Sequence, residues 1–252
     1  MNGTFTVEAE FVRRGLRHTV RNPDALVTAL ALPIIILLLF VYVFGGAIST
    51  RGQYVDYVVP GIVVLCAMFG AAGTAVGVCT DKVAGVMDRF RTMPIRSASV
   101  LTGHVVASLL RNLVSTAMVV GLAIAIGFRP NATALEWLAA TGVIVLVVLA
   151  ITWLATAAGL VAPTVESANA LGFTVMFLPY LSSAFVPVDT LPAALRPIAE
   201  HQPVTPVIET LRGLLIGTPI GAEIWWVLLW WGGLLVVAVA VASMLFRRQA
   251  RR

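Results

Sequence analysis

Apolar residues arrive in long blocks along the chain, separated by short polar segments, and do not alternate with polar residues as in a half-buried strand. A transmembrane helix needs about 20 mostly apolar residues to cross about 30 Å of hydrocarbon. Six blocks have this character, over about residues 25–44, 60–80, 100–128, 136–161, 168–186 and 223–246. The pattern therefore predicts an all-α membrane protein with six transmembrane helices.

Proline and glycine indicate where these spans begin, bend or pack. Pro33 and Pro179 lie inside the first and fifth spans, where neighbouring helices can satisfy the carbonyl that a proline leaves free. Pro60 is expected in the first turn of the second span, where a backbone N–H has no helical partner to lose. Gly73 and Gly77 form a GxxxG spacing in that span, which indicates close packing against another helix without identifying it.

The amino-terminal segment is amphipathic. Within residues 3–21, apolar side chains at helical spacing lie beside a basic stripe of Arg13, Arg17 and Arg21. Such a helix lies naturally in the membrane interface, with its arginines directed toward lipid headgroups. The sequence therefore predicts an interfacial helix before the first span.

The segment between spans five and six, residues 187–222, is too patterned to be a simple linker. Residues 191–200 can form one short helix. A second helix is expected to begin with Thr205 as its cap and to stop at Gly217. Its apolar stripe must be buried against the spans or the membrane.

The charge is low and unevenly placed. Charged residues make up 12% of the chain, about half the share of a soluble domain, and the net charge is +5. The sixteen arginines and single lysine flank the apolar blocks, which indicates topology and contact with anionic lipid, with no nucleic-acid partner. Twelve basic residues fall in the amino-terminal segment, the 81–99 loop and the tail, and the opposite loops hold four: Arg51, Arg129, Arg196 and Arg212. The positive-inside rule therefore places both termini in the cytoplasm.

Motifs for chemistry on the chain itself are missing from the sequence. The only lysine lies in Asp81-Lys82-Val83, which does not fit the GxxxxGK[ST] loop that cradles ATP phosphates. Cys66 and Cys79 are separated by about 20 Å of helix, too far for a disulfide, and neither has the spacing of a metal site. We expect no enzymatic activity, cofactor or metal on this chain.

One face of the third span is polar, with His104, Ser108, Arg111, Asn112 and Ser115 at helical spacing. Polar groups inside a membrane are costly and are often functional. The stripe can line a pathway, with Arg111 paired to Glu166. It can instead hold neighbouring helices together while Arg111 reaches toward the interface, and we favour this second interpretation.

The 81–99 loop mixes charge with apolar side chains that a solvated loop would not need: Val86, Phe90, Met93 and Ile95. A short amphipathic helix that docks into a protein groove would use them, and Pro94 would end it before the third span. The alternative is a loop folded against its own spans.

Two runs of residues resemble a known family. The first is Asp88-Arg89-Phe90-Arg91-Thr92-Met93-Pro94-Ile95, and the second combines Phe185-Val186-Pro187-Val188, Leu191-Pro192, Pro203-Val204-Thr205-Pro206 and Leu211-Arg212-Gly213. Together with six spans, they resemble the ABC-2 type permeases over nearly the whole chain, and most closely the daunorubicin-resistance branch of exporter permeases.

The resemblance implies a permease in the bacterial plasma membrane that pairs with a second copy or a related permease. Two separate ATP-binding subunits would bind ATP and Mg²⁺ and drive hydrophobic drug-like or lipid-like cargo outward. It implies a connecting helix in residues 1–24, a transmembrane domain over 25–246 with short outer helices in 187–222, and a basic tail at 247–252. The connecting helix carries Arg13, Arg14, Arg17 and Arg21, and the contacts of a coupling helix within 82–96 would be Lys82, Val86, Asp88, Arg89, Phe90, Arg91, Met93, Pro94 and Ile95.

Cargo contacts are expected where aromatic side chains lie in the spans. The candidates are Phe69, Phe173, Phe177 and Tyr180, with Arg111 and Asn112 as polar residues of the pathway. Each aromatic residue can instead serve helix packing or lipid contact. Other functions to be weighed are a polysaccharide or glycolipid exporter permease, an ATP-independent secondary transporter, a membrane-embedded enzyme and a membrane anchor.

Overall fold

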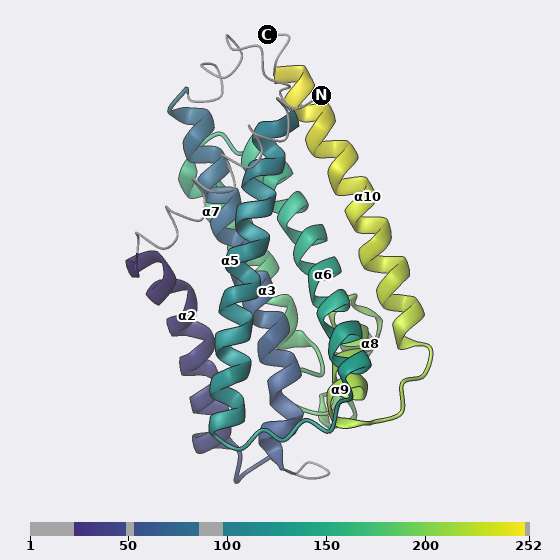
Figure 1. The fold of residues 1–252 in the computed structure, drawn as a ribbon. Helices are drawn as coiled ribbons and strands as arrows, with labels where there is room; N and C mark the ends of the chain where they lie inside the picture. Colours follow the sequence, from purple (N-terminus) through teal and green to yellow (C-terminus); the bar gives the residue numbers. More distant parts are fainter. Residues whose placement is uncertain (1–22, 49–52, 86–97, 250–252) are drawn as a thin grey trace.

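The structure, a computed structural model, describes residues 23–48, 53–85 and 98–249. All regular elements in these ranges are helices (Figure 1). Their bounds are α2 (Pro23–Leu38), the π-helix η1 (Leu39–Phe44), α3 (Tyr54–Val83), α5 (Ala98–Ala125), α6 (Ala134–Val161), α7 (Val165–Met176), the 3-10 helices η2 (Leu178–Leu181) and η3 (Val188–Thr190), α8 (Arg196–His201), α9 (Val204–Ile216) and α10 (Glu223–Gln249). The predicted all-α class is confirmed.

Four of the described helices, α3, α5, α6 and α10, are long and apolar enough to cross a membrane. They lie side by side along one axis, with α2 beside α5 at one edge and α10 against α6 at the other (Figure 1). The first apolar block forms α2, which continues directly into η1. The fifth block is divided: α7 ends at Met176, and residues 182–187 are not helical. The prediction of one helix over 168–186 is therefore wrong.

Helix α3 is the centre of the bundle, because most of its apolar stretch is buried, whereas only a minor part of that of α10 is buried. Neighbours approach its backbone closely at glycines. A Cβ added to Gly70 would stand 2.2 Å from the Asn112 amide nitrogen, and one added to Gly159 would stand 2.5 Å from the Ala75 carbonyl oxygen. Close packing on α3 is found at Gly70 and not at the GxxxG pair on which it was predicted, because an added Cβ on Gly73 or Gly77 meets no described atom within 4 Å.

The start of α3 differs from the prediction. The helix begins at Tyr54, so Pro60 lies inside it and not in its first turn. The extra residues are held by tertiary contacts: the hydroxyl of Tyr54 donates to the Phe185 carbonyl at 2.8 Å, and that of Tyr57 donates to the Ser183 carbonyl at 2.9 Å. These hydrogen-bond partners are distant in the sequence, so the local pattern could not predict them. Pro60 alone therefore indicated a later start of the helix.

The long segment after the fifth block folds back onto the bundle as helices, which confirms that it is not a simple linker. Helix α9 begins at Val204, and Thr205 does not cap it, since its hydroxyl donates to the Ala199 carbonyl instead. The predicted stop is correct: Gly217 takes the left-handed conformation, with φ +81°. The apolar stripe of α9 is buried in the main core, as its amphipathic pattern required.

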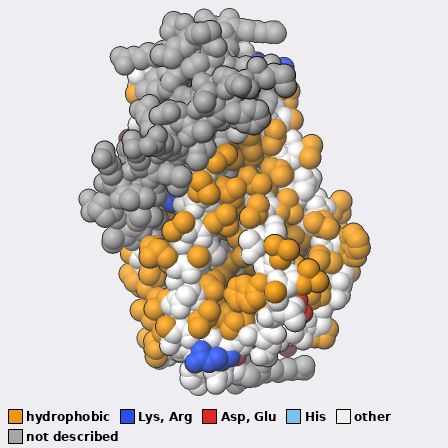
Figure 2. Space-filling model, in the orientation of Figure 1, with side chains coloured by type: hydrophobic (Ala, Val, Ile, Leu, Met, Phe, Trp, Pro, Cys, Tyr) orange, Lys and Arg blue, Asp and Glu red, His pale blue; other side chains and the backbone are white. Residues whose placement is uncertain are grey.

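The outside of the bundle is strongly apolar. Figure 2 shows hydrophobic side chains spread over much of the described part of one face, with charged side chains near its lower end. On α10, Trp225, Leu229 and Val236 are each more than half exposed. Apolar areas of this extent are not stable against water, and they indicate a lipid environment.

Candidate functional site

The break in the fifth block leaves a stretch of buried, non-helical backbone between η2 and η3. The irregular segment, residues 182–187, follows η2, and Ser182, Ser183, Ala184 and Phe185 in it are buried. Non-helical backbone at membrane depth is tolerated only where the protein satisfies its polar groups or where it lines an aqueous cavity. The backbone N–H and C=O groups of this segment therefore need hydrogen-bond partners from the rest of the protein.

Side chains from distant elements supply these partners. The hydroxyls of Tyr54 and Tyr57 donate to the carbonyls of Phe185 and Ser183, as described above. From the other side, the Gln202 amide donates to the Leu181 carbonyl at 2.5 Å. Within the segment, the Ala184 N–H donates to the Ser182 hydroxyl at 3.1 Å. The irregular segment is thus held by named hydrogen bonds and is not a loose loop.

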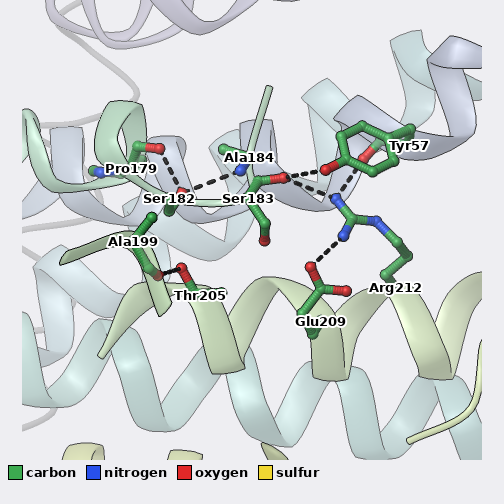
Figure 3. Close-up of polar contacts among 9 residues, drawn as sticks. All are labelled: Tyr57, Pro179, Ser182, Ser183, Ala184, Ala199, Thr205, Glu209 and Arg212. Carbon is green, nitrogen blue, oxygen red and sulfur yellow. Dashed lines mark hydrogen bonds and ion pairs between the residues drawn. The ribbon is translucent and has the colours of Figure 1, made fainter. Parts of the chain in front are cut away.

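Arg212 of α9 also contacts this segment, and it forms the Arg212 cluster with Tyr57, Ser183 and Glu209 (Figure 3). The side chain is buried, with 5% exposure. Its Nη2 donates to the carbonyls of Tyr57 at 3.0 Å and Ser183 at 3.1 Å, and its Nη1 donates to Glu209 Oε1 at 2.6 Å. The guanidinium carbon also lies 3.8 Å from the centre of the Tyr57 ring. One cation therefore joins α9, α3 and the irregular segment.

The sequence interpretation missed this role, because it counted Arg212 as a charge in an outer loop and as part of the Leu211-Arg212-Gly213 run and assigned it no contact. A signal was present. Arg212 is four residues after Ile208 and three before Leu215, so it lies on the same face of a helix as two residues of the apolar stripe. Both of these neighbours are buried. A cation within a buried stripe indicates a buried and partnered side chain.

A row of aromatic rings runs from α7 through the irregular segment to η1, and we name it the aromatic line. Its members, in order of contact, are Phe173, Phe177, Tyr180, Phe185, Phe40 and Phe44. Successive ring centroids are 6.4, 6.0, 5.2, 4.2 and 5.3 Å apart. The first three rings are exposed, whereas Phe185 is buried.

The structure thus brings together three of the four aromatic residues that the sequence selected as cargo contacts. The fourth, Phe69, lies half-buried on α3 and is not part of the line. Sequence reasoning missed Phe40, Phe44 and Phe185. The first two follow each other at helical spacing in the first span, but their contact with the fifth block is tertiary and leaves no local signal.

The polar face of α5 serves mainly as contact with α3. The Ser108 and Thr74 hydroxyls are 2.6 Å apart and buried, and Asn112 is buried against Gly70. Arg111 is half-buried, and the described residues show no ion pair between it and Glu166. The contacts of Ser108 and Asn112 are helix-packing contacts, and the reach of Arg111 toward the interface stays a prediction.

Glu166 lies instead exposed in the first turn of α7. Hydrogen bonding to its own backbone N–H, and then to the Thr164 side chain, holds the pKa of its carboxyl below the usual value. The Glu166 side chain therefore belongs to the start of α7 and not to a pathway inside the bundle.

Most residues predicted for the coupling helix and for the connecting helix lie outside the described residues. This applies to Val86, Asp88, Arg89, Phe90, Arg91, Met93, Pro94 and Ile95, and to the connecting-helix arginines Arg13, Arg14, Arg17 and Arg21. Lys82 is described: it is in the last turn of α3, and its ammonium donates to the Leu160 carbonyl at 2.9 Å and also to the Ala162 carbonyl. Within the described ranges, His, Cys, Asp and Glu side chains do not gather into a group that could hold a metal ion.

These features define a polytopic helical membrane protein whose bundle is interrupted near one end by a held, irregular segment. The profile of the ABC-2 type transporter family matches residues 10–216, and the chain belongs to this family. The family predicted from the sequence motifs is therefore confirmed.

Two relatives show how the similarity is distributed. The chain is 29% identical over 229 residues to the daunorubicin resistance ABC transporter permease protein DrrB1 of Streptomyces coeruleorubidus, covering 90% of this chain and 81% of that one. It is 26% identical over 225 residues to the protein of Mycobacterium tuberculosis named "Probable doxorubicin resistance ABC transporter permease protein DrrC", covering 84% of this chain and 79% of that one. The similarity extends over most of each chain. Both names confirm the predicted resemblance to the daunorubicin-resistance branch of exporter permeases.

Proposed function

We propose that this chain is the transmembrane permease subunit of an ATP-driven exporter for hydrophobic, drug-like cargo. The observation that carries the proposal is the aromatic line, which belongs to a chain of the ABC-2 type transporter family. Exposed aromatic rings offer large faces for stacking with flat apolar molecules. The two relatives named for daunorubicin and doxorubicin resistance support cargo of this chemical class.

The motor belongs to other subunits. The sequence has no phosphate-binding loop of its own, and the family is one of membrane transport subunits. We propose that two ATP-binding subunits bind ATP and Mg²⁺ and hydrolyse the ATP, and that a second copy of this chain or a related permease completes the membrane part. Residues 82–96 would contain the coupling helix, and residues 1–24 the connecting helix.

Six membrane crossings with both termini in the cytoplasm remain the proposed topology. Four crossings are the long helices. The first crossing is α2 followed by η1, which have 16 and six residues and together extend for about 30 Å at about 1.5 Å per residue. Helix α7 has 12 residues and η2 has four, which is about 26 Å with the steeper 3-10 rise. We propose that the irregular segment completes the fifth crossing, because side chains of other helices bond its backbone carbonyls.

The test is transport by the complex as it exists in the membrane. Inverted membrane vesicles with the permease and its co-purifying ATP-binding subunits are expected to accumulate daunorubicin when ATP is added. Phe177→Ala should lower the rate of accumulation by about three- to tenfold, since an aromatic contact contributes about 1 kcal/mol. Trp226→Ala removes an exposed ring from α10, outside the aromatic line, and should leave the rate unchanged.

Other outcomes would assign a different function. Accumulation that requires a proton gradient and no ATP would indicate a secondary transporter. ATP-driven movement of a lipid-linked glycan, with no transport of daunorubicin, would indicate the polysaccharide or glycolipid exporter. Failure to recover any ATP-binding subunit from native membranes would contradict the exporter itself.

A further inference from the structure

Two adjacent residues at the end of α3 reach two different helices. Asp81 Oδ2 lies 2.9 Å from Nε2 of His104, near the start of α5. Lys82 points elsewhere, and its ammonium donates to the carbonyls of Leu160 and Ala162 at the end of α6. The last turn of α3 is therefore tied to both neighbours at the end of the bundle from which residues 86–97 continue.

The acceptors of Lys82 are at the turn that joins α6 to α7. Helix α6 ends at Val161, and α7 begins at Val165. The last carbonyls of a helix have no partner within it and carry a partial negative charge, so an ammonium is a suitable donor for them. Cys79, one turn before Lys82, contacts the same turn: its thiol lies 3.6 Å from the Ala162 carbonyl oxygen.

Two small clusters of buried apolar side chains also join the end of α3 to the neighbouring helices. Cys79, Ala162 and Ala168 are buried together, which joins the end of α3 to the turn and to the first turns of α7. A second cluster of Val78, Leu160 and Phe246 adds the last turns of α10. Both clusters are separate from the main core of the bundle.

We propose that Lys82 is a positioning residue that fixes the α6–α7 turn to the end of α3, so that displacement of α3 by the ATP-binding subunits also moves α7 and its aromatic residues. Helix α5 receives such a displacement directly, because the chain from α3 leads into it. Helix α7 has no covalent link to α3 near this end. It packs against α3 along its length, and Lys82 adds hydrogen bonds from the last turn of α3 to the turn before α7. The inference rests on the proposed function, and it assigns Lys82 an internal contact in place of a docking contact.

The chemistry of lysine suits this role and defines the variants. Its four-carbon stem and three donors allow one side chain to bond two carbonyls. Lys82→Met keeps most of the length and removes the charge and the donors. Lys82→Arg keeps both. Arg248→Met removes an exposed positive charge at the end of α10 and is the matched control for charge alone.

The decisive quantity is the amount of daunorubicin transported per ATP hydrolysed, in proteoliposomes that contain the permease with its co-purified ATP-binding subunits. Charge-assisted hydrogen bonds are among the stronger ones, and Lys82→Met should lower this ratio by about tenfold. ATP hydrolysis and recovery of the ATP-binding subunits should stay near wild-type levels. Lys82→Arg should restore the ratio, and Arg248→Met should not change it.

Several results would overturn the inference. A wild-type ratio in Lys82→Met would show that the turn needs no such link. Loss of the ATP-binding subunits from that variant would make Lys82 a docking residue. If wild-type protein binds these subunits but ATP drives no transport, the proposed function fails first and the transmission role fails with it.

A second measurement does not depend on the folding of a variant. Lys82 is the only lysine in the sequence, so amine acylation by an N-hydroxysuccinimide ester can be followed at this one side chain by peptide mass spectrometry. In the intact complex, with and without ATP, Lys82 should react at least about tenfold more slowly than in the denatured chain, because its ammonium is engaged and half-buried. Rapid labelling in either state would contradict a fixed link.

Discussion

Arg212 shows, at the scale of a single residue, how a charge can be kept inside a membrane protein. Its guanidinium is bonded to one carboxylate and two carbonyls and lies over an aromatic ring. The ion pair with Glu209 reaches the surface, since the glutamate side chain is 36% exposed, so the charge is not isolated from solvent. Removing the cation would leave the Ser183 carbonyl with only the Tyr57 hydroxyl.

We predict that Arg212→Met lowers the free energy of unfolding by about 3 kcal/mol, because the carbonyls of Tyr57 and Ser183 lose a charged hydrogen-bond donor. The measurement is the midpoint temperature of thermal unfolding of the detergent-solubilised protein, compared between the variant and the wild type. Arg196→Met is the control: this exposed arginine also donates to two carbonyls, those of Asp189 and Leu191, and should change the free energy by less than about 0.5 kcal/mol. Equal losses in both variants would contradict the role of burial.

At the scale of elements, the length and apolar character of the spans were predictable, and their interruptions were not. Helices α6 and α10 begin or end within a few residues of the predicted bounds, because continuous apolar composition dominates there. The fifth block reads as one span in the sequence, yet Pro179 and the donors Tyr54 and Tyr57 divide it. Those donors are more than 120 positions away, so local patterns could not reveal the break.

The close approach of α6 to α3 gives a second prediction. Gly159→Ala should lower the free energy of unfolding by about 1–3 kcal/mol, because its Cβ would overlap the Ala75 carbonyl and also press on Val78. Gly73→Ala is the matched change on α3 itself and should leave stability unchanged or raise it by up to about 1 kcal/mol, through helix propensity. Thermal unfolding in the same detergent would compare the two, and an unaffected Gly159→Ala variant would show that the helices separate more easily than the structure indicates.

At the scale of the whole molecule, the sequence predicted the class, the family and three of the aromatic positions, whereas the assembled site depended on contacts between distant segments. The aromatic line joins the first and fifth blocks, and the Arg212 cluster joins α3 to α9. Composition and motifs identify which residues are available. Only the fold determines that Phe40 faces Phe185, and that Arg212 faces Tyr57.

Membrane orientation is the prediction at this scale. In a chain that carries Thr218→Cys, a membrane-impermeant maleimide should label the new thiol in intact cells, since this exposed residue follows α9 on the proposed outer side. Arg247→Cys, in the last turn of α10, should be labelled only after permeabilisation. The native Cys66 and Cys79 are buried and should remain unlabelled in both. The reverse pattern would invert the proposed topology.

The irregular segment also has a consequence for biosynthesis. When Ser183 leaves the ribosome, Tyr54 and Tyr57 already exist, but Arg212 follows 29 residues later. At about 5–20 residues per second, roughly one to six seconds pass before the last donor is made. The tyrosines are therefore the first to hold the nascent segment, and Arg212 completes it. A chain that stops before Arg212 would present a partly unsatisfied span to the proteases that remove unassembled membrane proteins.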